Sequence, residues 1–195
     1  MDASAVNVNV TVDDFDSVLS YPDQAAWQTP DPSSPTFDAS TTPWWMGTYH
    51  KTDVIDASVS FNFIGPALFI YGSSGPAYGS YEVQIDSVAS TFSAYAANNV
   101  SGSFLLFGAS NLTYAPHTLT LRNLGAKNGD AGGNALLFDY LRTTVQLAPA
   151  GYVLMLRFVS LGVLTVEQSY GIKHDLRRGR PGPHVFRNLE LQQIS

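Results

Sequence analysis

Short segments that alternate apolar and polar residues, separated by turn residues, are the feature that most constrains the fold of this chain. The clearest one runs from Val6 to Val12, where every second residue is valine. A period of two places alternate side chains on opposite faces of a strand, whereas a helix has a period of about 3.6. No stretch before residue 145 shows the helical period over about eleven residues or more. Similar strand-like runs, bounded by Gly, Pro and Asn, occupy residues 58–63, 67–71, 81–86, 104–107, 117–121 and 136–141. The pattern is typical of an all-β sandwich or barrel.

The composition agrees with a packed β domain that is stabilised by its own core. Hydrophobic residues make up 45% of the 195 residues and charged residues only 13%, which excludes a disordered chain. The 10 Tyr and 11 Phe suit pleated strands, where aromatic side chains pack well. There are no cysteines, so disulfide frameworks and thiolate metal sites are excluded.

Charge divides the chain into two parts. Residues 1–145 carry 4 Lys and Arg against 13 Asp and Glu (net −9), and residues 146–195 carry 6 against 3 (net +3), which together give −6. An acidic body lacks the basic face that phosphate neutralisation needs, so we expect no nucleic acid partner. We expect a β-sandwich domain over residues 1–147 and a C-terminal extension, apolar and then basic, over residues 148–195.

The extension admits three interpretations. Residues 148–166 are mostly apolar and are followed by basic residues, as in a membrane span with a cytoplasmic flank. Arg157 lies near the middle of this segment, where a charge costs about 2.5–3.5 kcal/mol. The alternatives to a membrane tether are an ordered soluble extension and a misassigned chain end.

Three N-glycosylation sequons favour an exported protein that is extracellular or on the cell surface. They begin at Asn9, Asn99 and Asn111. The chain starts at Met1 without a basic and apolar leader. A removed signal peptide and an intracellular location therefore both stay open.

Several segments, in their order and spacing, resemble basidiomycete fungal surface proteins with a galactose-binding-like domain. They are residues 11–14, 47–52, 57–63, 70–72, 75–76, 79–86, 117–123 and 138–141. The resemblance ends near Val145. It implies an antiparallel β-sandwich of the jelly-roll kind with an irregular C-terminal extension, usually exported and often tethered by one membrane helix. It brings no established chemistry with it.

A tandem tryptophan after a long loop supplies the main candidate binding residues. The loop spans residues 20–43 and contains five prolines. Sugars lay their apolar faces on aromatic rings, so Trp44, Trp45 and Tyr49 form a candidate carbohydrate-binding platform, with His50 as a donor to a sugar hydroxyl. Alternatively, one tryptophan fills the core while the other covers a loop, and His50 holds a loop by hydrogen bonds.

Clustered carboxylates after the first strand suggest a calcium site. Asp13, Asp14 and Asp16 could supply the oxygen ligands that this hard cation prefers, although acidic residues are also common in turns. Calcium is the one cofactor that the sequence suggests. Asp139 lies inside an apolar run, so we expect it either to face solvent or to have a partner, because unpaired burial is costly.

Signatures of enzymes are missing from the sequence. Residues 72–75 (GSSG) lack the spacing of a nucleophile elbow, and residues 125–133 lack the Gly-Lys-Ser/Thr motif of a phosphate-binding loop. Carboxylate pairs for glycoside hydrolysis could come from Asp53, Asp56, Glu82 or Asp86, but no spacing fixes them. We therefore expect no enzyme but a non-catalytic module that binds glycan or cell-wall polysaccharide. The alternatives are a structural or protein-interaction ectodomain and, third, a glycoside hydrolase.

Overall fold

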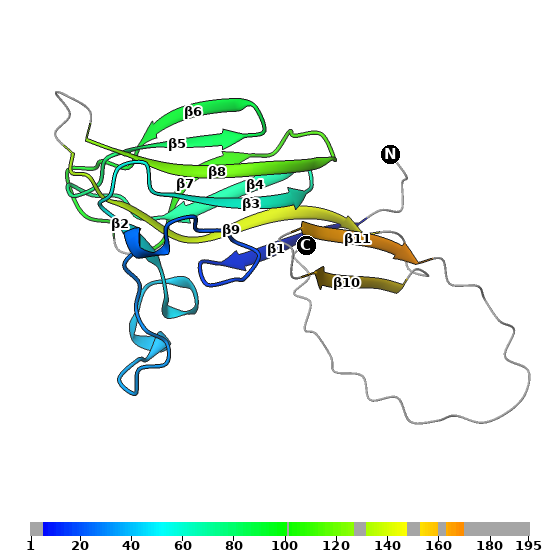
Figure 1. The fold of residues 1–195 in the computed structure, drawn as a ribbon, viewed down its shortest axis with the longest axis horizontal. Coiled ribbons are helices and arrows are strands. Elements are labelled where there is room, and N and C mark those ends of the chain that lie inside the picture. The colour runs from blue at the N-terminus through cyan, green and yellow to red at the C-terminus, as the bar shows by residue number, and fades with distance from the viewer. Residues whose placement is uncertain (1–5, 101, 127–131, 148–152, 160–162, 170–195) are drawn as a thin grey trace, which may run out of the picture.

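Two antiparallel β-sheets make up the body of the protein. The computed structural model describes residues 6–100, 102–126, 132–147, 153–159 and 163–169. Sheet A has the order β1 (Val6–Asp13), β9 (Leu136–Leu147), β4 (Ala67–Gly72), β7 (Phe104–Ala109), and β2 (His50–Thr52) also pairs with β9. Sheet B has the order β3 (Ser58–Ile64), β8 (Pro116–Gly125), β5 (Ser80–Ile85), β6 (Val88–Ser93). Figure 1 shows β6, β5 and β8 on one side of the body and β9 and β1 on the other.

Neighbouring strands in both sheets come from distant parts of the chain. β1 pairs with β9 along its whole length, from Val6 opposite Leu147 to Asp13 opposite Tyr140. In sheet B, β8 lies between β3 and β5, and all the pairs are antiparallel. This arrangement confirms the predicted all-β antiparallel sandwich of the jelly-roll kind.

The core lies between the two sheets and is built by alternate residues of the strands. In β3 the inward residues Val59, Phe61 and Phe63 are buried, while Asn62 is exposed. The other large buried side chains include Leu68, Ile70, Tyr81, Val83, Leu121, Phe138 and Leu141. Burial of one face per strand is what the alternating sequence pattern requires.

Tyr81 links the two sheets through its hydroxyl group. The hydroxyl of this β5 residue donates a 2.5 Å hydrogen bond to the carbonyl oxygen of Leu106 in β7, and burial raises the pKa of Tyr81 to about 12.

We expect Tyr81→Phe to lower the free energy of unfolding by about 1–2 kcal/mol, because the Leu106 carbonyl loses its donor in the interior. Urea denaturation measures this, with Tyr114→Phe at an exposed site as control. Equal stability of both variants with the parent chain would contradict it.

A β-bulge interrupts β9 beside β4. Tyr71 pairs with Tyr140 and Gly72 pairs with Phe138, so Asp139 is the extra residue. A Cβ atom on Gly72 would collide with the Leu137 carbonyl oxygen, which explains why glycine stands at this position. The bulge turns Asp139 into the interior, where its side chain is fully buried.

The segment between β1 and β2 projects from one end of the sandwich (Figure 1). It contains three single 3-10 turns, η1 (Gln24–Ala26), η2 (Ala39–Thr41) and η3 (Trp45–Gly47). Its prolines and polar residues agree with the long loop predicted from the sequence. The loop brings Trp45 onto the outward face of sheet A, against Tyr140 of β9.

The described parts of the C-terminal extension are two strands. β10 (Val153–Val159) and β11 (Val163–Ser169) pair as an antiparallel hairpin. The rest of residues 148–195 lies outside the described residues, so the domain boundary expected at residue 147 stays a prediction. Within the residues that the structure describes, no helix has both the length and the apolar character for a membrane span.

Candidate functional site

The outward face of sheet A carries aromatic side chains from β4 and β9. Ile70 and Leu141 point into the core, so their neighbours Tyr71 and Tyr140 point outward. The two tyrosines are direct partners across the strands, and their rings stack with centroids 4.4 Å apart and planes 15° apart. Burial raises the pKa of Tyr140 and outweighs the lowering by Arg142, so its hydroxyl keeps its proton at neutral pH.

Trp45 and Arg142 join these tyrosines. The Trp45 ring lies 5.5 Å from the Tyr140 ring at an angle of 45°, and 41% of Trp45 is exposed. The guanidinium carbon of Arg142 lies 5.8, 5.7 and 5.3 Å from the ring centroids of Trp45, Tyr71 and Tyr140. These distances allow cation–π attraction to each ring. We call Trp45, Tyr71, Tyr140 and Arg142 the aromatic–arginine cluster.

The buried carboxylate of Asp139 holds Trp45 in place. Its Oδ1 accepts a 3.0 Å hydrogen bond from the Trp45 backbone N–H, and its Oδ2 accepts a short one from the Ser103 hydroxyl. Burial raises the pKa of Asp139 to about 7; the bonds from Ser103 and Trp45 lower it, and the carboxylates of Asp14 and Asp13 raise it further. The partner that the sequence required for Asp139 is therefore the loop that carries the tryptophan.

The turn after Trp45 has an unusual backbone. Met46 and Gly47 both have positive φ angles, 54° and 84°. A Cβ atom on Gly47 would also crowd Ala39 of η2. The turn is therefore fixed both by its backbone conformation and by contact with the preceding part of the loop.

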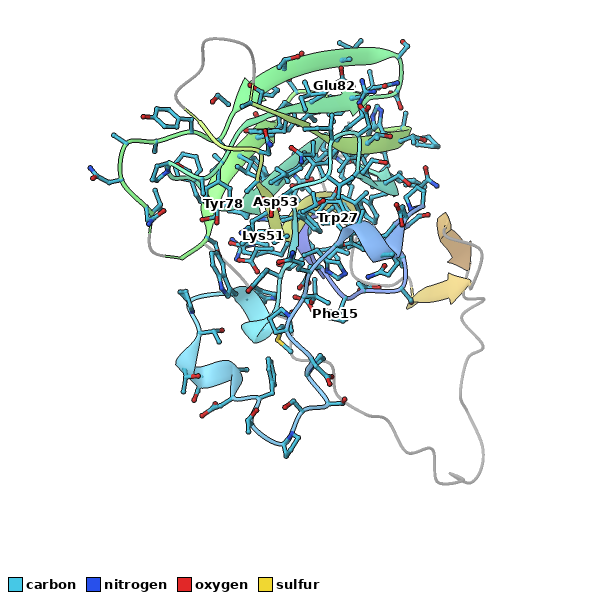
Figure 2. All side chains as sticks on the ribbon, turned by 60° about the vertical axis from the view of Figure 1, so that its left-hand side comes forward. Phe15, Trp27, Lys51, Asp53, Tyr78 and Glu82 are labelled. Atoms are coloured by element: carbon cyan, nitrogen blue, oxygen red, sulfur yellow. The ribbon has the colours of Figure 1, made fainter. Side chains whose placement is uncertain are left out.

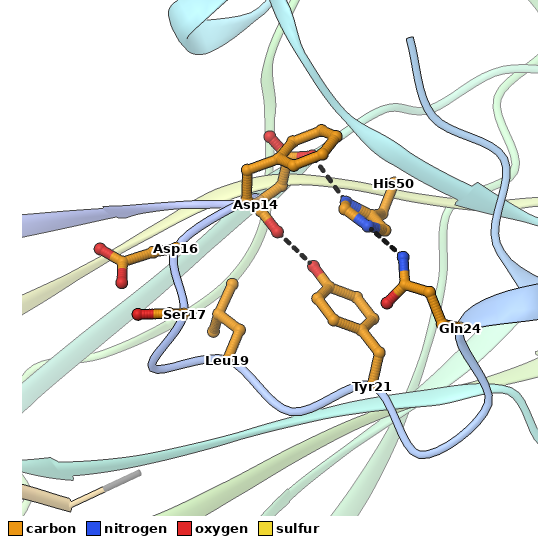
Figure 3. Close-up of a pocket in the computed structure, with 8 residues that line it drawn as sticks. Asp14, Asp16, Ser17, Leu19, Tyr21, Gln24 and His50 are labelled. Atoms are coloured by element: carbon orange, nitrogen blue, oxygen red, sulfur yellow. Dashed lines mark hydrogen bonds and ion pairs between the residues drawn. The ribbon is translucent and has the colours of Figure 1, made fainter. Parts of the chain in front are cut away.

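A pocket beside the loop is lined by Asp14, Phe15, Asp16, Ser17, Leu19, Tyr21, Gln24 and His50 (Figure 3). The carboxylate of Asp14 accepts a 2.6 Å hydrogen bond from the Thr48 hydroxyl, and its other oxygen lies 2.6 Å from His50 Nδ1. The Tyr21 hydroxyl donates to the Asp14 backbone carbonyl at 2.8 Å, and its ring stacks on His50 with centroids 4.2 Å apart. This network fastens the loop to β2.

The hydrogen bonds of His50 show which form of the imidazole fits the site. An ionised carboxylate only accepts hydrogen bonds, so Nδ1 donates to Asp14 and Nε2 accepts from the Gln24 amide at 3.0 Å. In a hydrolytic triad, the second nitrogen faces a hydroxyl or thiol nucleophile instead. Figure 3 shows Asp16 and Ser17 pointing away from His50. Among the described residues that line the pocket, none therefore presents a nucleophile to the Asp14–His50 pair.

The structure separates the four residues that the sequence grouped as a carbohydrate platform. Trp44 packs edge-to-face on Tyr49 with ring centroids 5.4 Å apart, whereas Trp45 packs on Tyr140. His50 is only 2% exposed and both its ring nitrogens are engaged, so its expected role as a donor to sugar is corrected to a structural one. Trp27 is buried and lies among the crowded interior side chains in Figure 2.

The three candidate calcium ligands have different surroundings. Asp14 is occupied by Thr48 and His50, and Asp16 accepts a hydrogen bond from the backbone of Val18. Asp13 keeps a buried carboxylate oxygen without a hydrogen-bond partner, and burial, followed by the charge of Asp14, raises its pKa to about 6. Among the residues that the structure describes, no three His, Asp or Glu side chains are grouped to hold a metal ion. The calcium site stays a prediction from the sequence.

Three of the four carboxylates considered for glycoside hydrolysis are engaged in ion pairs. Glu82 and Asp56 both bind Arg122, at 2.7 and 3.4 Å, and Asp86 binds His117 at 2.8 Å. Figure 2 shows Glu82 on sheet B, well apart from Asp53. The asparagines of the three sequons, Asn9, Asn99 and Asn111, are exposed, and glycosylation of them stays a prediction.

Sequence reasoning missed Tyr71, Tyr140 and Arg142 as site residues. Residues 67–71 are a continuous apolar run, so the sequence gives no signal that Tyr71 faces outward, and alternation appears only in the burial of β4. Positions 140 and 142 continue an apolar run in which the faces cannot be told apart without the bulge at Asp139. Only the pairing of β4 with β9 brings these side chains together.

Comparisons with known proteins give distant similarities. No protein-family model matches the chain. The chain is 33% identical over 115 residues to the A type blood N-acetyl-alpha-D-galactosamine deacetylase of the bacterium Flavonifractor plautii. The match covers 58% of this chain and 13% of that protein. The chain therefore spans only a small part of this relative. A basidiomycete origin stays a prediction.

Among solved structures, the fold is similar to part of a two-domain esterase (CEX) active on acetylated mannans, co-crystallised with mannopentaose. The TM-score is 0.50 at 11% identity, over 72% of this chain and 37% of that one. A carbohydrate-binding module CBM36 in complex with calcium and xylotriose matches with a TM-score of 0.40 at 12% identity, over 70% of this chain and 99% of that one.

Proposed function

We propose that the sandwich is a non-catalytic carbohydrate-binding module whose ligand lies on the aromatic–arginine cluster. The observation that carries this proposal is the exposed Trp45 ring, fixed at its backbone by Asp139 and packed on the buried Tyr140, beside the half-buried Tyr71. The Trp45 ring supplies an apolar face on which a sugar can stack, and the Arg142 guanidinium supplies a polar group for orientation. An exposed face gives modest affinity, because little ligand surface is buried.

The similarity to a deacetylase named for a carbohydrate substrate supports a role with glycans. The chain spans only 13% of that protein, so catalysis is not carried over with the similarity. The Asp14–His50 dyad gives no support for hydrolysis either, because the second ring nitrogen of His50, Nε2, accepts a hydrogen bond from the Gln24 amide. An extracellular or cell-surface location fits a glycan-binding role and forms part of the proposal.

A protein-interaction ectodomain is the second candidate, and one observation favours it. Phe104 and Leu105 of β7 are exposed, and Leu105 is the direct partner of Tyr71. The face beside the cluster is therefore apolar as well as aromatic. Exposed apolar patches of this kind also mark protein-binding surfaces.

Binding of glycans to the full chain tests the proposal. We expect affinity electrophoresis in gels containing xylan, mannan, β-glucan, galactan or polygalacturonate to show retardation by at least one polysaccharide. Trp45→Ala is expected to weaken this binding about tenfold, because ring stacking contributes roughly 0.5–1.5 kcal/mol beyond the buried area. Tyr114→Ala, which removes an exposed ring that is not part of the cluster, is the control and is expected to bind normally.

Two results would overturn the proposal. The first is the absence of retardation by every polysaccharide for a chain whose circular dichroism shows a folded β protein. The second is equal loss of binding in the Trp45 and Tyr114 variants. The first result, together with capture of a protein partner that depends on Leu105, would favour the interaction ectodomain.

A further inference from the structure

Arg142 is a cation on an acidic domain, and no carboxylate in the described part of the chain pairs with it. Among the residues that the structure describes, the ion pairs engage His50, His117 and Arg122, and none engages Arg142. Arg122 shows the contrast, since it binds both Asp56 and Glu82. A guanidinium keeps its charge at all physiological pH values and has five N–H donors to satisfy.

The strand pairing explains where the Arg142 side chain lies. Arg142 stands opposite Phe69 on β4 and Thr11 on β1, on the outward face of sheet A. Neither neighbour carries a charge. Among the residues of β1 that pair with β9, the acidic residue nearest to Arg142 is Asp13, which stands opposite Tyr140. One carboxylate oxygen of Asp13 is buried without a hydrogen-bond partner.

The aromatic rings use only part of the binding capacity of the guanidinium. A cation over a ring is attracted through the face of that ring, while the N–H donors of a guanidinium lie in its own plane. Three rings within 6 Å therefore restrict where the guanidinium lies without satisfying its donors. A carboxylate fits these donors best, because two of its oxygens can accept two parallel N–H bonds.

We propose that the aromatic–arginine cluster selects glycans with carboxylate-bearing (uronic acid) units, with the sugar ring on Trp45 and its carboxylate on Arg142. This inference rests on the proposed glycan-binding function. Ordinary salt screens the repulsion between the acidic body and an acidic polymer beyond about 8 Å, so the short-range pairing with Arg142 decides the outcome at about 0.15 M salt. The cluster then distinguishes sugars by charge as well as by shape.

Polygalacturonate and its fully methyl-esterified form test this selection, because they share a backbone and differ in the charge of the carboxyl group. We expect the full chain to bind polygalacturonate at least about tenfold more tightly than the ester, which corresponds to roughly 1.4 kcal/mol. Arg142→Gln is expected to remove this preference, and Arg142→Lys to retain only part of it, since an ammonium group lacks the bidentate geometry. Arg122→Gln is the matched control and is expected to keep the preference.

The outcomes separate this inference from the proposed function. Suppose that the chain binds the ester or neutral polysaccharides as tightly as polygalacturonate, and that this binding is lost in Trp45→Ala but unchanged in Arg142→Gln. This result would overturn the selection of uronic acids and leave the glycan-binding function standing. Equal effects of the Arg142 and Arg122 substitutions would also overturn it, because the attraction would then be unspecific. No binding to any of these polymers by the folded chain would overturn both.

Discussion

Asp14→Ala is expected to lower the free energy of unfolding by about 3–5 kcal/mol, the largest loss that we anticipate from one side chain outside the apolar core. Asp14 is fully buried, and its two carboxylate oxygens bind the Thr48 hydroxyl and His50 Nδ1 at 2.6 Å each. The substitution leaves both donors without a partner in the interior. Each such group costs about 1–3 kcal/mol.

The effect should extend from stability to binding. The Asp14 network attaches the loop to β2, and the same loop carries Trp45 to the cluster. Under conditions in which the variant is still folded, we therefore expect weaker glycan binding than in the parent chain. Urea denaturation followed by tyrosine and tryptophan fluorescence measures the first effect, and affinity electrophoresis measures the second.

Asp16→Ala provides the control for this prediction. Asp16 lies two residues away, is only partly buried and binds just the backbone N–H of Val18. We expect a loss of about 1 kcal/mol or less. If Asp14→Ala were no more destabilising than Asp16→Ala, the network around His50 would not hold the loop as described.

The strands were predictable wherever one face of a strand is buried. The alternation in β3 and β8 marks these strands directly, because a period of two is imposed by the core. The valines of β1 alternate in the same way, although only Val12 is buried and Val6 is exposed. β6 was missed since its residues are almost all exposed at the edge of sheet B. β2 was missed because three residues are too short to show a period.

The site was predictable only in part, because its contacts join distant residues. The aromatic residues of the loop pointed to Trp45, but Tyr71 and Tyr140 meet only through a strand pair that spans the domain. For His50 the sequence left open a donor to sugar and a residue that holds a loop, and only the fold brings its partner Asp14, 36 residues earlier, into contact with it. A sequence shows which side chains are capable of binding, and the register of the sheets decides which of them are free.

The stability of the domain is expected to fall as the pH rises from about 4 to about 7, and Asp139 is expected to be the main cause. Its pKa is raised from 3.8 to about 7 in the folded protein. Between these values the folded state holds a proton that the unfolded state has released, so rising pH favours unfolding, and the contribution is complete above about pH 7. A shift of about three units corresponds to about 4 kcal/mol as an order of magnitude.

Two other groups change stability in the same direction. Asp13 has its pKa raised to about 6, so its contribution is also lost with rising pH, to a smaller extent because it is partly exposed. For His117, burial lowers the pKa, but the hydrogen bonds with Asp86 and with the Thr113 carbonyl raise it more, so its pKa lies above 6.5. A raised histidine pKa stabilises the folded state at low pH, and this stabilisation disappears as the pH rises through the folded value.

Asp139→Asn isolates the contribution of the buried carboxyl group. The amide oxygen can still accept from the Trp45 backbone N–H, and the amide nitrogen can donate to the Ser103 hydroxyl, so the bulge keeps its partners. We expect the variant to match the parent at about pH 4 and to be more stable by a few kcal/mol at about pH 8, where the parent must bury a charge. Urea denaturation across this range measures both curves. A variant less stable than the parent at about pH 8 would mean that the ionised carboxylate stabilises the bulge, and that its hydrogen bonds from Trp45 and Ser103 outweigh the cost of its burial.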